Sequence, residues 1–150
     1  MAETDRLKTI LERQDAADRA HVAELARQAA AESAARASRT RVVIEWRQLC
    51  DVLKETIATA NAKMTGGRKF YSQPYNPHAE HTVADLIILS EDKYSEYVEQ
   101  KCVVGVHLDG TVFVSINGSI PQSKEYRLNI WNATREQIEG IVYDFMELTI

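Results

Sequence analysis

Two histidines and a glutamate stand close together in the run His78-Ala-Glu-His81. Imidazole nitrogens and carboxylate oxygens are common ligands of zinc and other divalent ions. An HxxH pair alone supplies too few ligands, so His107 or a distant acidic residue would have to complete a metal site. A polar loop is the simpler interpretation, and we expect neither a metal nor another cofactor.

The run Thr65-Gly-Gly-Arg-Lys-Phe-Tyr combines loose backbone with two cations and two aromatic rings. A phosphate group or a nucleic-acid strand could use such a mixture, although the P-loop spacing GxxxxGK[ST] is missing. Basic residues just after a helix end explain the same run, because cations are favoured there. If a small ligand binds, we expect its site in the loop of residues 66–81, with these residues: Arg68, Lys69, Tyr71, Tyr75, His78 and His81.

Nothing in the sequence indicates nucleophilic catalysis. The G-x-S-x-G pattern is absent, and Cys50 and Cys102 stand alone, as small buried hydrophobes do. His107 falls in an apolar strand pattern, so a core histidine is favoured over a general base. Asp51 and Glu55 lie one helical turn apart, and a solvated helix face explains them better than an acid–base pair. The sequence therefore favours a non-enzymatic protein without deciding the question.

Composition divides the chain into two parts. Residues 1–45 hold twelve alanines, eight basic and eight acidic residues, whereas every Gly, Pro and aromatic residue lies in 46–150. The second part carries ten basic and fourteen acidic residues, which opposes broad attraction to nucleic acid. The longest apolar run, Leu86–Leu89, is too short to span a membrane. We expect a cytoplasmic protein that binds neither membrane nor nucleic acid.

A helical pattern covers residues 3–64, which contain no Gly or Pro and are rich in helix formers. Its second part has one wide apolar face that should cover a sheet, and Gly66-Gly67 should end it. A break near Ser38-Arg39-Thr40 would fit, since Ser and Thr can cap a helix. The sequence leaves open whether residues 3–64 form one helix or two. The apolar face of the second part consists of Val42, Trp46, Leu49, Leu53, Ile57 and Ala60.

The first part of this helix carries a narrower apolar stripe on another side. The stripe consists of Leu7, Ile10, Leu11, Val22 and Leu25. Exposed apolar surface of this kind predicts self-association or docking on a protein partner, with a dimer as the simplest closed form. Gln14, His21 and Gln28 occupy one column of the heptad frame, so any coiled coil should be weak.

Strand patterns follow at residues 83–90, 97–108, 111–117 and 125–131, whereas residues 66–81 predict a loop or irregular strand. Asp109-Gly110 predicts a two-residue hairpin loop that pairs Val106 with Phe113 and His107 with Val112. Both sheet faces are then largely apolar, so both should be covered. Thr134-Arg-Glu-Gln137 matches a capping box and should open a helix to about Thr149.

The sequence thus predicts an α+β fold. A long N-terminal helical segment precedes a mainly antiparallel sheet of four or five strands, packed by helices 42–64 and 135–149. Residues 1–40 form an Ala-rich charged helix and residues 41–150 an α+β domain. The favoured function is a non-enzymatic interaction or assembly protein, either a homo-oligomer or bound to a protein partner. The alternative is a small-ligand-binding or catalytic domain with its site in the 66–81 loop.

Overall fold

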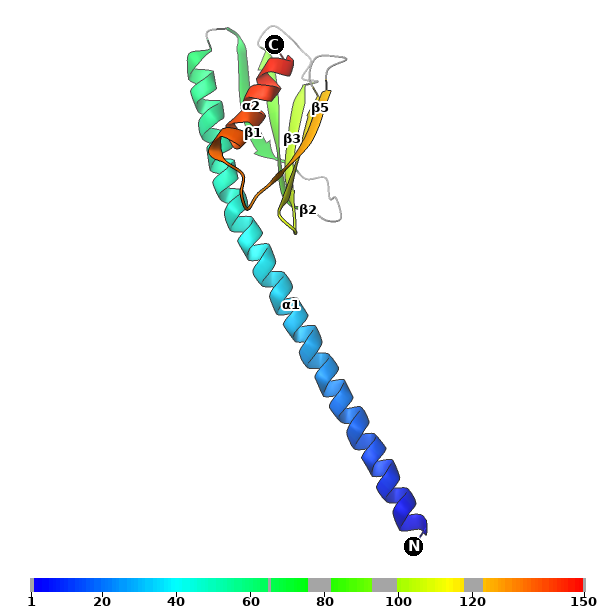
Figure 1. The fold of residues 1–150 in the computed structure, drawn as a ribbon. Helices are drawn as coiled ribbons and strands as arrows, with labels where there is room; N and C mark the ends of the chain where they lie inside the picture. The colour runs from blue at the N-terminus through cyan, green and yellow to red at the C-terminus, as the bar shows by residue number, and fades with distance from the viewer. Residues whose placement is uncertain (1, 65, 76–81, 93–99, 118–122, 150) are drawn as a thin grey trace. The chain divides into compact units, whose positions relative to one another are not determined.

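The computed structural model describes residues 2–64, 66–75, 82–92, 100–117 and 123–149 (Figure 1). The chain divides into two compact units, residues 1–37 and residues 38–150. Helix α1 (Ala2–Lys63) contributes to both units and stays helical through Ser38 and Thr40. The break considered at that point is wrong, because no Gly or Pro interrupts the backbone hydrogen bonds there.

The second unit is the predicted α+β fold. Its sheet has the strand order β1-β2-β3-β4-β5, with every neighbouring pair antiparallel. Residues 68–74 form a regular edge strand, where the sequence had indicated a loop or an irregular strand. The elements are β1 (Arg68–Pro74), β2 (Thr82–Asp92), β3 (Lys101–His107), β4 (Thr111–Asn117), β5 (Ser123–Asn129) and α2 (Arg135–Thr149).

The core lies between one face of the sheet and two helices, the second half of α1 and α2 (Figure 1). Helix α1 contributes the predicted stripe around Trp46, and α2 contributes residues three and four apart that end at Phe145. The ring of Phe145 meets that of Phe70 edge to face, with centroids 5.6 Å apart. The strands contribute alternate residues: Phe70, Leu86, Ile88, Cys102, Val104, Val106, Val112, Val114 and Ile116.

The β3–β4 hairpin differs from the predicted pairing by one residue. Val106 lies opposite Val112, and Val104 lies opposite Val114. Gly110 has a φ of +91°, and its N–H donates to the His107 carbonyl at 3.0 Å, so residues 108–110 form a three-residue loop. A shift of one residue moves each side chain of one strand to the other face. The buried valines of β3 and β4 therefore all share the helix-covered face. The predicted cover of the other face stays a prediction: Ile87 is only 5% exposed there, although neither α1 nor α2 packs on that face in the described part of the chain.

Trp131 holds the tip of this hairpin in place. Its indole Nε1 donates to the Asp109 carbonyl at 3.1 Å, and a Cβ on Gly110 would overlap the same ring. The guanidinium of Arg41 in α1 lies 5.2 Å from the ring centroid, which is a cation–π distance. The three contacts tie the turn to α1 and to the segment before α2.

The outer edge of β1 is closed by the side chain of Asn61 in α1. Its amide accepts from the Phe70 N–H at 2.9 Å and donates to the Phe70 carbonyl at 2.7 Å. The amide thus pairs with β1 as a neighbouring strand would, and such covering limits unwanted pairing at a sheet edge.

The capping box is present as predicted. Gln137 Oε1 accepts from the Thr134 N–H at 3.0 Å, and Thr134 Oγ1 accepts from the Gln137 N–H at 3.2 Å. Neither α1 nor α2 contains a stretch apolar and long enough to cross a bilayer, as judged over the described residues.

Candidate functional site

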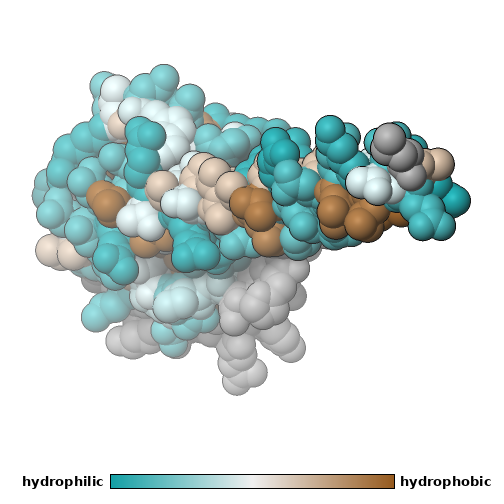
Figure 2. Space-filling view, turned by 90° about the horizontal axis from the view of Figure 1, so that it is seen from below, coloured by the Kyte–Doolittle hydropathy of each residue, from teal (hydrophilic) through white to brown (hydrophobic). Residues whose placement is uncertain are grey.

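The apolar stripe of residues 2–37 is the first candidate surface. The side chains of its five predicted members are between 51% and 65% exposed: Leu7, Ile10, Leu11, Val22 and Leu25. Leu7 and Leu11 lie in a shallow apolar depression bordered by the charged residues Lys8, Glu12 and Asp15. Figure 2 shows interrupted hydrophobic surface along this helix between hydrophilic side chains. The apolar face of this helix is therefore discontinuous and exposed to solvent.

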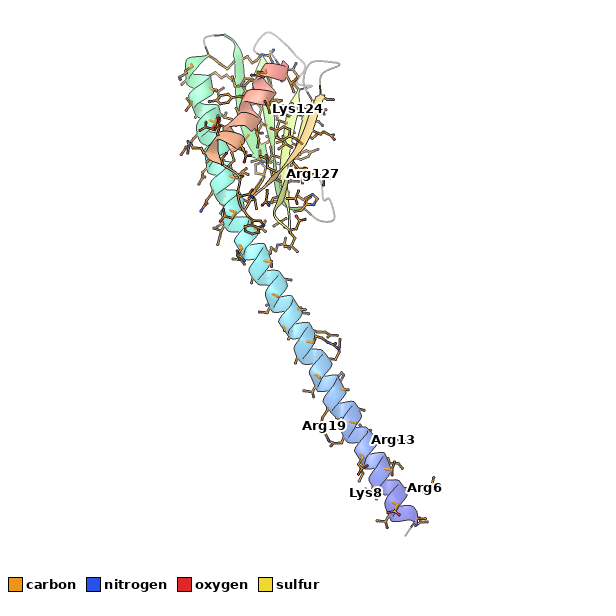
Figure 3. The ribbon with its side chains drawn as sticks, in the orientation of Figure 1. Arg6, Lys8, Arg13, Arg19, Lys124 and Arg127 are labelled. Atoms are coloured by element: carbon orange, nitrogen blue, oxygen red, sulfur yellow. The ribbon has the colours of Figure 1, made fainter. Side chains whose placement is uncertain are left out.

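Charges of both signs flank the stripe. Lys8 and Arg19 extend on one side of the helix and Arg6 and Arg13 on the other (Figure 3). Arg19 forms an ion pair with Asp15 one turn before it. Because acidic and basic residues alternate, this helix does not present a surface of one sign, which would suit a nucleic acid.

A hollow of about 630 Å³ on the sheet face away from the helices is the second candidate. The imidazole of His107 meets the Phe113 ring edge to face, with centroids 5.0 Å apart. Gly105 makes room for that ring, because a Cβ there would overlap it. The corrected register places these residues on one face. The hollow is lined by Thr82, His107, Phe113, Val114, Ser115, Glu125, Tyr126 and Arg127.

Three polar side chains of the hollow make no hydrogen bond or ion pair with another described residue: Thr82, Glu125 and Arg127. Glu125 and Arg127 are exposed on β5, and neither makes an ion pair or hydrogen bond with a described residue. The hydroxyl of Thr82 is buried and also lacks a hydrogen-bond partner among those residues. Figure 3 labels Arg127 on β5. A guanidinium beside two aromatic rings can bind a planar anion.

Four of the six predicted ligand residues lie in the described part of the chain, and they are divided between the two faces of β1 and the residue after it. Arg68 donates to Ser90 Oγ and to Gln100 Oε1, both at 2.9 Å. Side chains alternate along a strand, so Lys69 and Tyr71 lie on the face of β1 opposite to Arg68, where both are exposed. Tyr75 is half-buried after β1. His78 and His81, and with them the HxxH run, lie outside the described residues.

The hollow was missed from the sequence because its position depends on the register of the hairpin. With Val106 paired to Phe113, that ring would lie on the same face as Val104 and Val106, and His107 would lie on the other face beside Val112. The expectation that His107 is a core residue is wrong. Its half-buried ring lies on the face away from the helices. The signal that could have found the site is the combination of Gly105 and Gly110 with Phe113.

Neither cysteine is set up as a nucleophile. Burial raises the pKa of the Cys102 thiol to about 12, and the nearby negative charge of Asp144 acts in the same direction. Burial also raises the pKa of Cys50 to about 11, although Lys54 partly opposes it. Because the thiolate is the reactive form, both side chains stay protonated and inert at neutral pH.

Two further groups of titratable residues join neighbouring helices and strands. Glu55 Oε2 accepts from Arg135 Nη2 at 2.6 Å, so this carboxylate links α1 to α2 rather than pairing with Asp51. Burial, together with the negative charge of Asp144, raises the pKa of the Tyr126 hydroxyl. The Nζ atom of Lys124 lies 3.3 Å from Asp144 Oδ2.

The described residues contain no group of three His, Cys, Asp or Glu side chains that could hold a metal ion.

The chain matches no known protein-family model, no curated protein and no solved structure.

Proposed function

We propose that the protein is a non-enzymatic assembly protein in which residues 2–37 join two copies of the chain, while the α+β unit recognises a further partner. The observation that carries the proposal is the exposure of the five large apolar side chains along one helix. Packing usually supplies most of the stability of a helix in water, so a helix of this kind gains from a second apolar surface.

The free energies of apolar burial and of association support a dimer of modest affinity. Ten large apolar side chains, five from each copy, start about half-exposed. Covering them contributes on the order of 10 kcal/mol, at roughly 1.5–3 kcal/mol for each fully buried side chain. Lost translational and rotational freedom costs roughly 4–15 kcal/mol on association. The two terms are of similar size, so the pair should form reversibly and depend on concentration.

Charge also permits a second copy as the occupant of this surface. Residues 2–37 carry six basic and seven acidic residues. Two such segments therefore repel one another little through their net charge, and their alternating signs allow ion pairs between chains.

Light scattering on the full-length chain and on residues 40–150 tests the proposal. At high concentration we expect the mass of two chains for the full-length protein and of one chain for the truncated one. Residues 40–150 contain the whole described core, so we also expect a cooperative melt by circular dichroism. A one-chain mass for the full-length protein at every concentration, or a two-chain mass for the truncated chain, would contradict the proposal. An aggregated or molten truncated chain would show that residues 41–150, the predicted α+β domain, do not fold without residues 1–39.

A second candidate function, binding of a small planar anion, is favoured by the hollow on the sheet face away from α1 and α2. The Arg127 guanidinium has no partner among the described residues, so it can bind a carboxylate or phosphate in two-point fashion. His107 and Phe113 can contact a ring. This proposal moves the site from the 66–81 loop to β3, β4 and β5.

Two matched variants distinguish these sites, Arg127→Gln in the hollow and Lys69→Gln on β1. Benzoate, salicylate and adenosine monophosphate serve as probes, and NMR chemical-shift titration of the full-length protein measures binding. We expect Arg127→Gln to weaken binding about tenfold or more, since a hydrogen bond to a charged group contributes about 1.5–3 kcal/mol. Lys69→Gln should leave binding unchanged. If only Lys69→Gln weakened binding, the site in the 66–81 loop would be favoured. If wild type bound none of the probes, the anion-binding function would be contradicted.

A further inference from the structure

The first 28 residues of α1 carry a repeating row of positions three and four residues apart. Such a row forms the contact seam when two helices pack along their length. The row consists of Thr4, Leu7, Leu11, Gln14, Asp18, His21, Leu25 and Gln28. Polar residues occupy its two ends and its middle, and Leu7, Leu11 and Leu25 lie between them.

This row is symmetric about Ala16 in one specific way. Leu7 and Leu25 lie nine residues before and after Ala16, and Gln14 and Asp18 lie two residues before and after it. Leu11 and His21 are five residues away on either side. Two copies that run in opposite directions with Ala16 at the centre would therefore place the members of each pair opposite one another.

We infer that two copies of residues 2–37 pair in antiparallel orientation, centred near Ala16. Leu7 of each copy packs against Leu25 of the other, and Leu11 packs against the His21 ring. The Gln14 amide donates to the Asp18 carboxylate of the other copy at the centre. This inference rests on the proposed two-copy assembly and specifies how the two chains meet.

The described side chains already show the central polar groups on one face. Gln14 Nε2 donates to Asp18 Oδ1 at 2.9 Å within one helix, so the same groups are positioned to exchange with their counterparts in a second copy. Asp15 lies beside Gln14 near the symmetry axis, and its negative charge is offset by the ion pair that it forms with Arg19. Every charged group at the centre therefore has a partner of suitable chemistry in this orientation.

The parallel orientation lacks this complementarity. Two parallel helices in register place each seam residue opposite its own copy, so Asp18 would face Asp18 at the centre of the seam. Like charges brought together in an interface are strongly unfavourable. Antiparallel pairing removes that contact and retains Leu7 and Leu25 in apolar layers.

Disulfide trapping in the full-length chain tests the orientation. Thr4→Cys and Gln28→Cys change two polar seam positions and keep all five apolar residues, and both are made with Cys50→Ala. The buried Cys102 stays in place. After equal amounts are mixed and oxidised, we expect the mixed disulfide to exceed either self-disulfide about tenfold, because effective concentration favours opposed thiols. Mass spectrometry of the digested products identifies each link.

A second measurement uses Asp18→Asn. In antiparallel pairs the introduced amide still meets Gln14, so the dissociation constant of the pair should change less than about threefold. In parallel pairs the loss of an Asp18–Asp18 contact would tighten association more than about tenfold. Predominant self-disulfides or tighter association of Asp18→Asn would overturn the antiparallel inference alone. A one-chain mass for wild type in light scattering, or a mass of three or more chains, would overturn the two-copy proposal and this inference with it.

Discussion

Replacing Phe145 with alanine is expected to lower the free energy of unfolding by about 3–5 kcal/mol. The side chain is fully buried between α2, α1 and the sheet, and its edge-to-face contact with Phe70 is lost as well. A domain of this size is stable by only about 5–15 kcal/mol, so the loss is a large fraction of the total. Urea unfolding followed by tryptophan fluorescence measures it, because Trp46 and Trp131 both lie in the α+β unit.

Tyr143→Ala is the matched control, since it removes an aromatic ring two residues earlier on α2. Tyr143 is 47% exposed, so we expect a loss below about 1 kcal/mol. A small loss for Phe145→Ala, or equal losses for both variants, would show that α2 does not pack through Phe145.

Periodicity along the sequence was sufficient to predict the helix-covered core. The stripe around Trp46 and the α2 face that ends at Phe145 are both buried as expected. These predictions succeed because a three-to-four residue spacing needs no knowledge of distant contacts. The start of α2 succeeds for the same reason, since the capping box involves only Thr134 and Gln137.

The hairpin register could not be predicted in the same way. Asp109-Gly110 is compatible with a two-residue or a three-residue loop, and the local sequence does not separate them. In the structure Gly110 packs under Trp131, which lies far along the chain, beyond β5. That distant contact accompanies the longer loop, which places His107 and Phe113 on the sheet face away from the helices. The candidate hollow therefore depended on information that no short sequence window contains.

Strand β1 shows a related limit. Pro74 and the glycines before Arg68 favoured a loop, yet residues 68–74 pair with β2 along their whole length. Two tertiary contacts support the strand: the Asn61 amide on its outer edge and the burial of Phe70 under the helices. Pro is tolerated at the end of an edge strand because its missing N–H is not needed there.

Changing Leu11, Val22 and Leu25 together to glutamate is expected to convert the two-chain form to one chain. The variant removes six apolar side chains from the proposed interface of a pair and adds six carboxylates. We expect the dissociation constant to rise more than about 100-fold, which corresponds to only about 2.7 kcal/mol. Glutamate is a good helix former, so helicity should be retained in circular dichroism. Light scattering across a concentration series measures the change.

The variant Ala20→Glu, Ala23→Glu and Ala30→Glu is the matched control, because it adds the same charge away from the stripe. These three alanines are exposed on other sides of the helix. If loss of apolar contact drives dissociation, this control stays largely paired, whereas general charge repulsion would separate both variants alike. A two-chain mass that persists in the Leu11, Val22 and Leu25 variant would place the association elsewhere in the chain. Equal dissociation of both variants would show that the stripe has no specific role.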